Sequence, residues 1–292
     1  MARGRIVVGV DGSRSSRRAL EWAWEEARRR GATLEAVTAW DTPVEVGMLV
    51  APTDTYDFET PAHETLDEEL DAVVGPGAPE VVRRVECGYA ARVLIDASRG
   101  AELLVVGSRG RGEFAGMLLG SVSRHCTAHA HCPVVVVRGE DDGSMVERRH
   151  RIVVGVDGSP SSRHALEWAA KEAKLRDDAL EAVIAWPQSS YPANPEWPLD
   201  FEGIARETLK AELRAVVGPE AANVTQRVEY GPAAHLLTEA SRAADLLVVG
   251  SRGRGAFAGM LLGSVSHHCT AHAYCSVVVV RGDEEHEAVT GH

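Results

Sequence analysis

The sequence predicts an α/β protein built from two similar domains, each with a parallel sheet covered by helices on both faces. The first observation is an internal repeat, because "RIVVGVDGSRSSRRALEWAWEEA" at Arg5 returns as "RIVVGVDGSPSSRHALEWAAKEA" at Arg151. The second is that short apolar runs alternate with helix-like stretches in each copy, as the crossover connections of parallel strands require. The third is the length of 292 residues, which suits two domains. A repeat this long indicates duplicated whole domains rather than the short units of a solenoid.

Five apolar runs in the first copy predict its strands. Their near-continuous hydrophobicity is typical of strands that are buried on both faces of a sheet. The runs are Ile6–Val10, Leu34–Trp40, Val81–Val85, Leu103–Val106 and Val134–Val137.

Four stretches between these runs predict helices. In "SSRRALEWAWEEARRRG", alanines and a leucine recur at helical spacing behind an N-cap serine, and Gly31 follows as a C-terminal glycine would. The other three are "HETLDEELDAVVG", "YAARVLIDASRGA" and "GSVSRHCTAHAH". The segment from Asp41 to Pro61 lacks such a pattern, and we expect it to be a long loop.

A polar, charged segment, "RGEDDGSMVERRH" at 138–150, predicts the linker between the copies. We therefore expect the first domain at residues 1–140 and the second at 149–283.

Composition excludes several classes of partner. The net charge of −12 argues against nucleic acid and anionic membrane surfaces. No apolar stretch reaches the length of a membrane span, and no apolar targeting segment precedes the first predicted strand, so we expect a cytoplasmic protein. Five cysteines in so long a chain favour reduced thiols over a disulfide framework.

A glycine-rich loop follows the fourth predicted strand of each copy. "VVGSRGRGEFAGMLLGSVS" at 105–123 returns at 248–266, and the copies differ only at Glu113 and Ala256. Glycines permit positive φ and let backbone N–H groups approach an anion, and the serine of the closing Gly-Ser would open a helix whose dipole favours phosphate. Ligands of such sheets bind beyond the carboxyl ends of the strands, where this loop falls.

Two better-known phosphate loops are absent from the sequence. There is no G-x-x-x-x-G-K-[ST], and "GVDGSRSS" after the first strand is not G-x-G-x-x-G. The cations of this cradle would have to be Arg109 and Arg111.

Histidines and cysteines gather in "HCTAHAHC" and "HCTAHAYC" before the last strand of each copy. Their spacing lacks the paired ligands of a zinc site. No G-x-S-x-G nucleophile elbow occurs either. We predict neither a metal site nor catalytic residues.

Taken together, these motifs resemble the universal stress protein family in its tandem, ATP-binding form. The resemblance includes "VVGVDGS" near the start of each copy, a glycine after the third strand (Gly88 and Gly231), "LLVVGSRGRG", and the spacing G-x-x-G, nine residues, G-S. It implies a flavodoxin-like, Rossmann-like sheet of five strands in the order 3-2-1-4-5. It also implies ATP, with Mg²⁺ held by the phosphates, across the carboxyl ends of strands one and four.

The resemblance assigns a role to each matching residue. Asp11 and Asp157 would face the adenosine, Gly9 and Gly155 would line the base, and Ala39 and Ala185 would contact adenine through the main chain. The loops would wrap the ribose and phosphates, and the Gly-Ser pairs would close over the outer phosphates. Loop and pair residues are Gly107, Ser108, Arg109, Gly110, Arg111, Gly112, Glu113, Gly120 and Ser121, and Gly250, Ser251, Arg252, Gly253, Arg254, Gly255, Ala256, Gly263 and Ser264.

The chain departs from the family beside the adenine position. That position is usually aliphatic, whereas Trp40 and Trp186 occupy it here. A side chain of this size would tighten or distort the base pocket.

Three functional classes remain open from the sequence. The resemblance favours a stress-response regulator that senses ATP or AMP and forms a homodimer of tandem chains. A slow ATPase or adenylyl-transfer enzyme could use the same cradle, but such chemistry needs a base or water-positioning group. Glu113 is the one carboxylate in the first loop, and alanine replaces it in the second. An interaction scaffold with vestigial loops is the third class.

Overall fold

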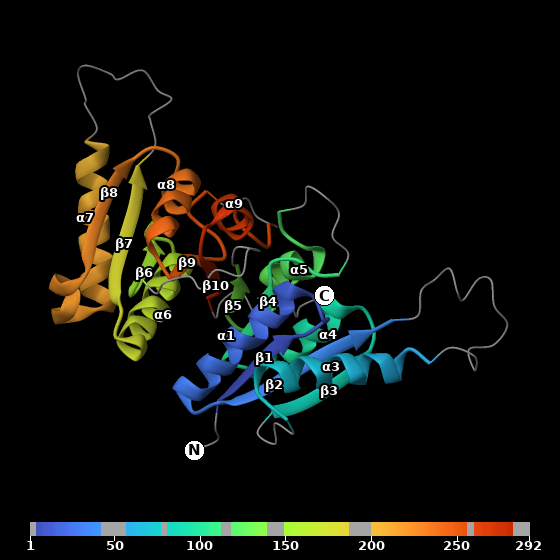
Figure 1. Cartoon of the computed structure of the whole chain (residues 1–292). Coiled ribbons are helices and arrows are strands. Elements are labelled where there is room, and N and C mark those ends of the chain that lie inside the picture. The colour runs from blue at the N-terminus through green and yellow to red at the C-terminus, as the bar shows by residue number, and fades with distance from the viewer. Residues whose placement is uncertain are drawn as a thin grey trace. The chain divides into compact units, whose positions relative to one another are not determined.

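A computed structural model describes residues 4–41, 57–76, 81–111, 118–138, 149–186, 200–255 and 260–282. The chain divides into two compact units, Met1–Arg138 and Gly139–His292 (Figure 1). Strands and helices alternate in both units, and all strand pairs described within a unit are parallel. The predicted α/β class is confirmed.

Among the described residues, each unit contains five strands and four α-helices. Those of the first unit are β1 (Arg5–Gly9), α1 (Arg14–Arg30), β2 (Thr33–Trp40), α3 (Glu59–Val73), β3 (Val81–Cys87), α4 (Ala90–Ala97), β4 (Leu103–Gly107), α5 (Ser121–His129) and β5 (Val134–Val137). Those of the second are β6 (Arg151–Gly155), α6 (Pro160–Arg176), β7 (Ala179–Trp186), α7 (Phe201–Val216), β8 (Thr225–Tyr230), α8 (Ala233–Ala240), β9 (Leu246–Gly250), α9 (Ser264–His272) and β10 (Ser276–Val280), with short 3₁₀ turns η1 (Gly218–Asn223) and η2 (Ser241–Ala243).

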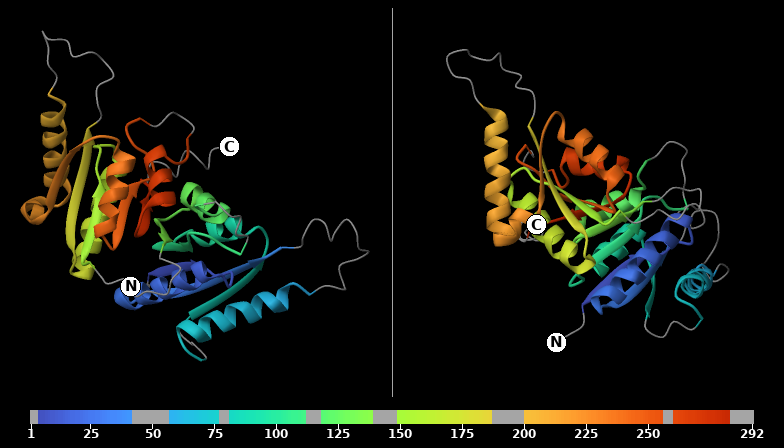
Figure 2. Two further views of the ribbon diagram at one scale, coloured as in Figure 1. Left: turned by 45° about the horizontal axis from the view of Figure 1, so that its top comes forward. Right: turned by 60° about the vertical axis from the view of Figure 1, so that its left-hand side comes forward.

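Hydrogen bonding orders the strands β3-β2-β1-β4-β5 in the first unit and β8-β7-β6-β9-β10 in the second. Helices α1 and α3 cover one face of the first sheet, and α4 and α5 cover the other. In the second unit α6 and α7 share one face, and α8 and α9 share the other (Figure 2). The central strands β1 and β4 are therefore enclosed, and their carboxyl ends meet at one edge.

Helix α1 shows why this sequence packs so closely on its sheet. Ala19, Leu20 and Ala23 are fully buried, and the small alanines let the helix backbone approach the strands. Ser13 caps the first turn by accepting a hydrogen bond from the backbone N–H of Ser16, and Gly31 ends the helix in the left-handed region at φ 63°. The predicted C-terminal boundary at Gly31 is confirmed, whereas the helix begins earlier than predicted, because the N-cap is Ser13 and not a serine of the "SSRR" segment.

Two expectations about local structure are wrong. Helix α3 begins at Glu59, so the end of the expected loop at 41–61 is helical, although residues 42–56 lie outside the described part. Strand β3 is an edge strand with largely solvent-accessible residues rather than a strand buried on both faces. Its Arg83 and Arg84 make ion pairs with Asp67 and Glu35.

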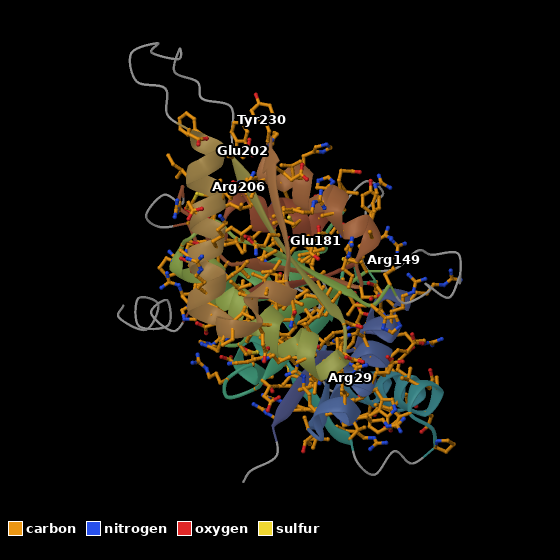
Figure 3. The ribbon with its side chains drawn as sticks, turned by 90° about the vertical axis from the view of Figure 1, so that its left-hand side faces the viewer. Arg29, Arg149, Glu181, Glu202, Arg206 and Tyr230 are labelled. Carbon is orange, nitrogen blue, oxygen red and sulfur yellow. The ribbon has the colours of Figure 1, made fainter. Side chains whose placement is uncertain are left out.

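A bidentate ion pair fixes α3 against α1. The Arg17 guanidinium donates from Nε and Nη2 to the buried Glu69 carboxylate at 2.7 and 2.8 Å. Arg163 and Glu212 repeat this pair in the second unit, at 2.8 Å for both bonds. A further buried glutamate, Glu181 on β7 (Figure 3), accepts a hydrogen bond from Arg227 on the neighbouring strand at 2.8 Å. Such planar pairs add geometric specificity to the helix packing.

None of the described helices combines the length and apolar content that a membrane-spanning helix requires.

Candidate functional site

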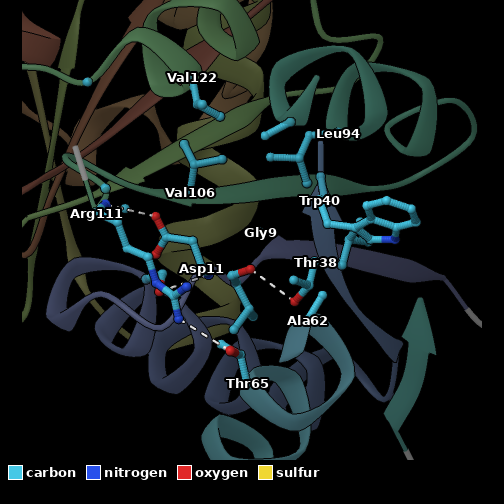
Figure 4. Close-up of a pocket in the computed structure, with 18 of the residues that line it drawn as sticks. Gly9, Asp11, Thr38, Trp40, Ala62, Thr65, Leu94, Val106, Arg111 and Val122 are labelled. Carbon is cyan, nitrogen blue, oxygen red and sulfur yellow. Dashed lines mark hydrogen bonds between the residues drawn. The ribbon is translucent and has the colours of Figure 1, made fainter. Parts of the chain in front are cut away.

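Each unit has a pocket at the carboxyl edge of its sheet, where its two central strands end. The first has a volume of about 520 Å³ and the second about 360 Å³, both within the roughly 300–1,000 Å³ of small-molecule sites. Strand ends form the floor, and the loop after β4 with the start of α5 forms one wall (Figure 4). In the first pocket, Ala62 and Thr65 of α3 and Leu94 of α4 complete the lining.

Most of the residues chosen from the sequence converge on these pockets. Ser108 and Ser251 do not line them, because their hydroxyls face α1 and α6, where they contact the hydroxyls of Ser15 and Ser161 at 3.4 and 3.0 Å. Gly112, Glu113 and Ala256 lie outside the described residues. The residues that line the pockets as expected are Gly9, Asp11, Ala39, Gly107, Arg109, Gly110, Arg111, Gly120 and Ser121, and Gly155, Asp157, Ala185, Gly250, Arg252, Gly253, Arg254, Gly255, Gly263 and Ser264.

Asp11 joins the end of β1 to the glycine loop. Its carboxylate accepts hydrogen bonds from the backbone N–H of Ser13 at 3.0 Å and from that of Arg111 at 3.2 Å. Asp157 makes the same two bonds, to Ser159 at 2.9 Å and Arg254 at 3.0 Å. The aspartate therefore caps the turn and holds the loop, while Ser13 caps the helix.

The environment of Asp11 favours its charged form. Burial acts to raise the pKa of Asp11, but hydrogen bonds from Ser13, Ser16 and the backbone of Arg111 outweigh burial and lower it. The pKa of Asp157 is lowered against the same opposing effect of burial. Each carboxylate is thus an anion with two backbone donors, poorly suited to accept a proton.

We expect Asp11→Asn to destabilise the first unit by about 1 kcal/mol at pH 7, the usual contribution of one hydrogen bond. Because the pKa of Asp11 is lower in the folded state than in the unfolded chain, where it is about 3.9, the charged carboxylate stabilises the fold at pH values above about 3.9. This stabilisation is lost as the pH falls through the pKa of the folded state. Denaturant unfolding at pH 7, 5, 4 and 3 should therefore show a weaker loss on acidification in the variant than in the wild type. The control is Glu64→Gln, an exposed side chain on α3. An equal acid dependence in Asp11→Asn and wild type would contradict the assignment.

The glycines of the loop are needed for a different reason from the one expected. Gly107, Gly110 and Gly120 do not have positive φ. A Cβ on Gly107 would lie 2.7 Å from the backbone carbonyl carbon of Ser15, and one on Gly110 would lie 2.6 Å from the Asp11 carboxylate. Close approach to α1 and to Asp11, rather than backbone conformation, requires glycine at 107 and 110. Gly12, in the turn after β1, is the position with positive φ, at 76°.

Helices α1 and α5 both begin at this edge, and they differ at their first turn. Helix α1 has the Ser13 side-chain cap. Helix α5 starts after Gly120, and no side chain in the described structure caps it; α9 starts in the same way after Gly263. The first N–H groups of a helix have no intrahelical acceptor. The first turn of the helix after each glycine loop can therefore receive a ligand.

Arg111 reaches across the pocket from the loop to α3. Its guanidinium Nη2 donates to the Thr65 hydroxyl at 3.3 Å (Figure 4). Arg254 and Thr208 both lie against Gly158 in the second unit. A cation thus borders each pocket on the side of the glycine loop.

Three lining residues of the first pocket that were not expected from the sequence bear on its shape. They are Thr65, Leu94, which lies beneath Gly9, and Ser123, whose hydroxyl donates to the Gly107 carbonyl at 2.6 Å. Two of them had a usable signal, because the triplet "ETL" with Thr65 and the segment "GSVS" with Ser123 recur in both copies. Leu94 had none, since its helical pattern indicates only which face is apolar.

The cysteines of the "HCTAHAHC" motif lie in the core. Burial raises the pKa of the Cys126, Cys132 and Cys269 thiols to about 12, which keeps them protonated and unreactive. Within the described ranges, no group of three or more His, Cys, Asp or Glu side chains is arranged to hold a metal ion.

The two units define a class: α/β proteins with tandem parallel sheets, each with a glycine-lined pocket at the carboxyl edge. The model of the universal stress protein family matches residues 2–138 and 148–281. The chain belongs to the universal stress protein family.

Similar proteins agree with this membership over nearly the whole chain. A universal stress protein of Mycobacterium tuberculosis is 34% identical over 292 residues, covering 94% of this chain and 96% of that one. One of Mycolicibacterium smegmatis is 37% identical over 289 residues, with 94% and 96% covered. The crystal structure of a universal stress protein from Archaeoglobus fulgidus has the same fold, with a TM-score of 0.66, 21% identity, and 95% and 98% of the two chains covered.

Proposed function

We propose that the chain is a regulatory protein that binds an adenine nucleotide, ATP with its Mg²⁺, in each of its two pockets. The observation that supports this most is the combination of a glycine loop and an uncapped helix N-terminus in one cavity. Backbone N–H groups and the helix dipole at such an end favour phosphate. The aliphatic side chains around Leu94 and Val37 suit an apolar base.

The residues fit the parts of the nucleotide in order along the pocket. Gly120 and Ser121 would meet the outer phosphates, with Arg109 and Arg111 supplying positive charge nearby. Gly9 would lie against the base, because its missing side chain leaves the floor open above Leu94. Mg²⁺ commonly keeps several waters and takes substrate phosphates with one or two carboxylates, so the phosphates would be its main ligands here.

The pocket suits binding better than turnover. Among its described lining residues, the carboxylates are Asp11 and Asp41 in the first pocket and Asp157 in the second. Asp11 and Asp157 are engaged by backbone donors and have lowered pKa values, which makes them weak bases. Affinity for ATP without selective stabilisation of a transition state is the expected result.

We expect two ATP molecules per chain at saturation in a calorimetric titration. At a free concentration of about 100 times Kd, one site should stabilise its unit by roughly 2.7 kcal/mol, or about 5–11 °C in Tm at about 2–4 °C per kcal/mol. Mass spectrometry of nucleotide released from the denatured, purified protein identifies the bound species. A phosphate-release assay run beside the titration tests the enzyme alternative. Turnover of order 1 s⁻¹ or faster, which is usual for enzymes, would overturn the assignment as a binding protein.

The cytoplasmic location and the homodimer of tandem chains stay predictions. Sedimentation velocity of the full chain with and without Mg-ATP measures the second of these directly.

A further inference from the structure

The strands that flank the two pockets end in the same residue type. Strand β2 ends at Trp40 and β7 ends at Trp186. The backbone after the neighbouring strand binds both tryptophans alike: Gly88 N–H donates to the Trp40 carbonyl at 2.8 Å, and Gly231 N–H donates to the Trp186 carbonyl at 3.1 Å. Any difference between the two indoles therefore comes from their side-chain neighbours.

Those neighbours differ. Trp40 is in register with Cys87, the last residue of β3, and Trp186 is in register with Tyr230, the last residue of β8. The rings of Trp186 and Tyr230 pack against each other with centroids 4.7 Å apart at an angle of 59°. Figure 3 shows Tyr230 at this end of the second unit. Cys87 has no ring to offer, so within the described residues Trp40 has no equivalent contact.

The lining of the pockets follows this difference. Trp40 lines the first pocket, together with Phe58 of the segment before α3. Trp186 is not among the described residues that line the second, which is also the smaller of the two. Figure 4 shows Trp40 and Arg111 on opposite sides of the first pocket. An indole is thus present at the end of the cavity away from the glycine loop, where a base would lie if phosphates occupy the loop.

We propose that the two pockets are not equivalent: Trp40 stacks on a purine base in the first, whereas Tyr230 withholds Trp186 from the base in the second. This inference rests on the proposed nucleotide binding. Stacking of a base on an aromatic ring is sequence-tolerant but stronger for a larger π face. The first pocket is then the tighter site and the one that prefers purine over pyrimidine nucleotides, and the residue at the end of the third strand of each unit sets this property.

The test is calorimetric titration of the full chain with Mg-ATP and Mg-CTP. We expect two phases for ATP, the first about tenfold tighter, which corresponds to about 1.4 kcal/mol, and a smaller difference between the phases for CTP. Trp40→Leu should weaken the tight phase about tenfold, while the matched Trp186→Leu should leave both phases within about twofold, a change of less than 0.5 kcal/mol.

Exchange of the strand-end residues reverses the difference. Tyr230→Cys should free Trp186 and tighten the weak phase, and Cys87→Tyr should give Trp40 a ring to pack on and weaken the tight phase. Two ATP sites of equal affinity that do not respond to Trp40→Leu would overturn this inference and leave the proposed function intact. Absence of ATP binding at both sites would instead remove the proposed function itself.

Discussion

Gly107→Ala is expected to destabilise the first unit by about 3 kcal/mol, at the upper end of the usual range for overpacking. The added Cβ would lie 2.7 Å from both the carbonyl carbon and the oxygen of Ser15. These are backbone atoms in the first turn of α1, which Ser13 caps and whose alanine face is buried on the sheet. To relieve the clash, either α1 or β4 would have to shift, and either movement would disrupt this buried packing. Gly250→Ala should act in the same way against Ser161 in the second unit.

Gly120→Ala is the matched control for this prediction. A Cβ there would come no closer than 3.4 Å to any atom, an ordinary contact, and the residue has φ −67° and ψ 155°, which alanine adopts freely. Urea unfolding of both variants without nucleotide compares the two glycines. Equal stabilities would show that α1 moves freely and that Gly107 is not required for packing.

The combined variant Gly120→Val with Gly263→Val should lose ATP affinity by at least about 100-fold, or roughly 2.7 kcal/mol. Gly120 and Gly263 line the pockets at the uncapped starts of α5 and α9. Valine methyl groups there would occupy the space in which phosphate oxygens meet the helix N–H groups. Hydrogen bonds to a charged group contribute about 1.5–3 kcal/mol each, so the loss of one or two of them accounts for the expected change.

These positions separate binding from folding better than Gly110 and Gly253. A Cβ at either of the latter would displace the Asp11 or Asp157 carboxylate, at 2.6 and 2.5 Å, and so disturb the loop itself. Circular dichroism and a melting curve without ligand should match the wild type, and calorimetry measures the loss of binding. Retained ATP affinity in a folded double variant would show that α5 and α9 are not the phosphate sites.

The fold was predictable from the sequence because the strong signals are local and are repeated in both copies. Runs such as "LLVVG" recur with the same neighbours, and a buried parallel strand needs only apolar residues to be recognised. The start of α3 was not predictable in this way, since Glu59 to Pro61 follow a segment without periodicity. The exposure of β3 was also missed, because its apolar residues were taken as those of a buried strand, although the implied order 3-2-1-4-5 places the third strand at an edge of the sheet.

The candidate site was predictable to the level of the backbone. The spacing of Gly107, Gly110 and Gly120 located the loop. The reason for Gly107 and Gly110, however, depends on contacts with Ser15 and Asp11, which are distant in sequence: Asp11 and its partner Arg111 are 100 residues apart. The contrast between Trp40 and Trp186 was invisible for the same reason. The register of β2 on β3 and of β7 on β8 decides which side chain stands beside each indole, and this register is a property of the folded sheet.

The missing side-chain cap of α5 means that a nucleotide bound as proposed would become part of the secondary structure. In α1 the chain supplies its own capping oxygen through Ser13, but in α5 that role is left open, and a phosphate in the proposed position would fill it. The phosphate would then serve as the N-cap of the helix, and this cap would be present only at high nucleotide concentration. The extent of fraying at the start of α5 and α9 would therefore depend on the nucleotide concentration in the cell. A partner that binds the start of these helices would respond to that concentration without any hydrolysis in the pocket.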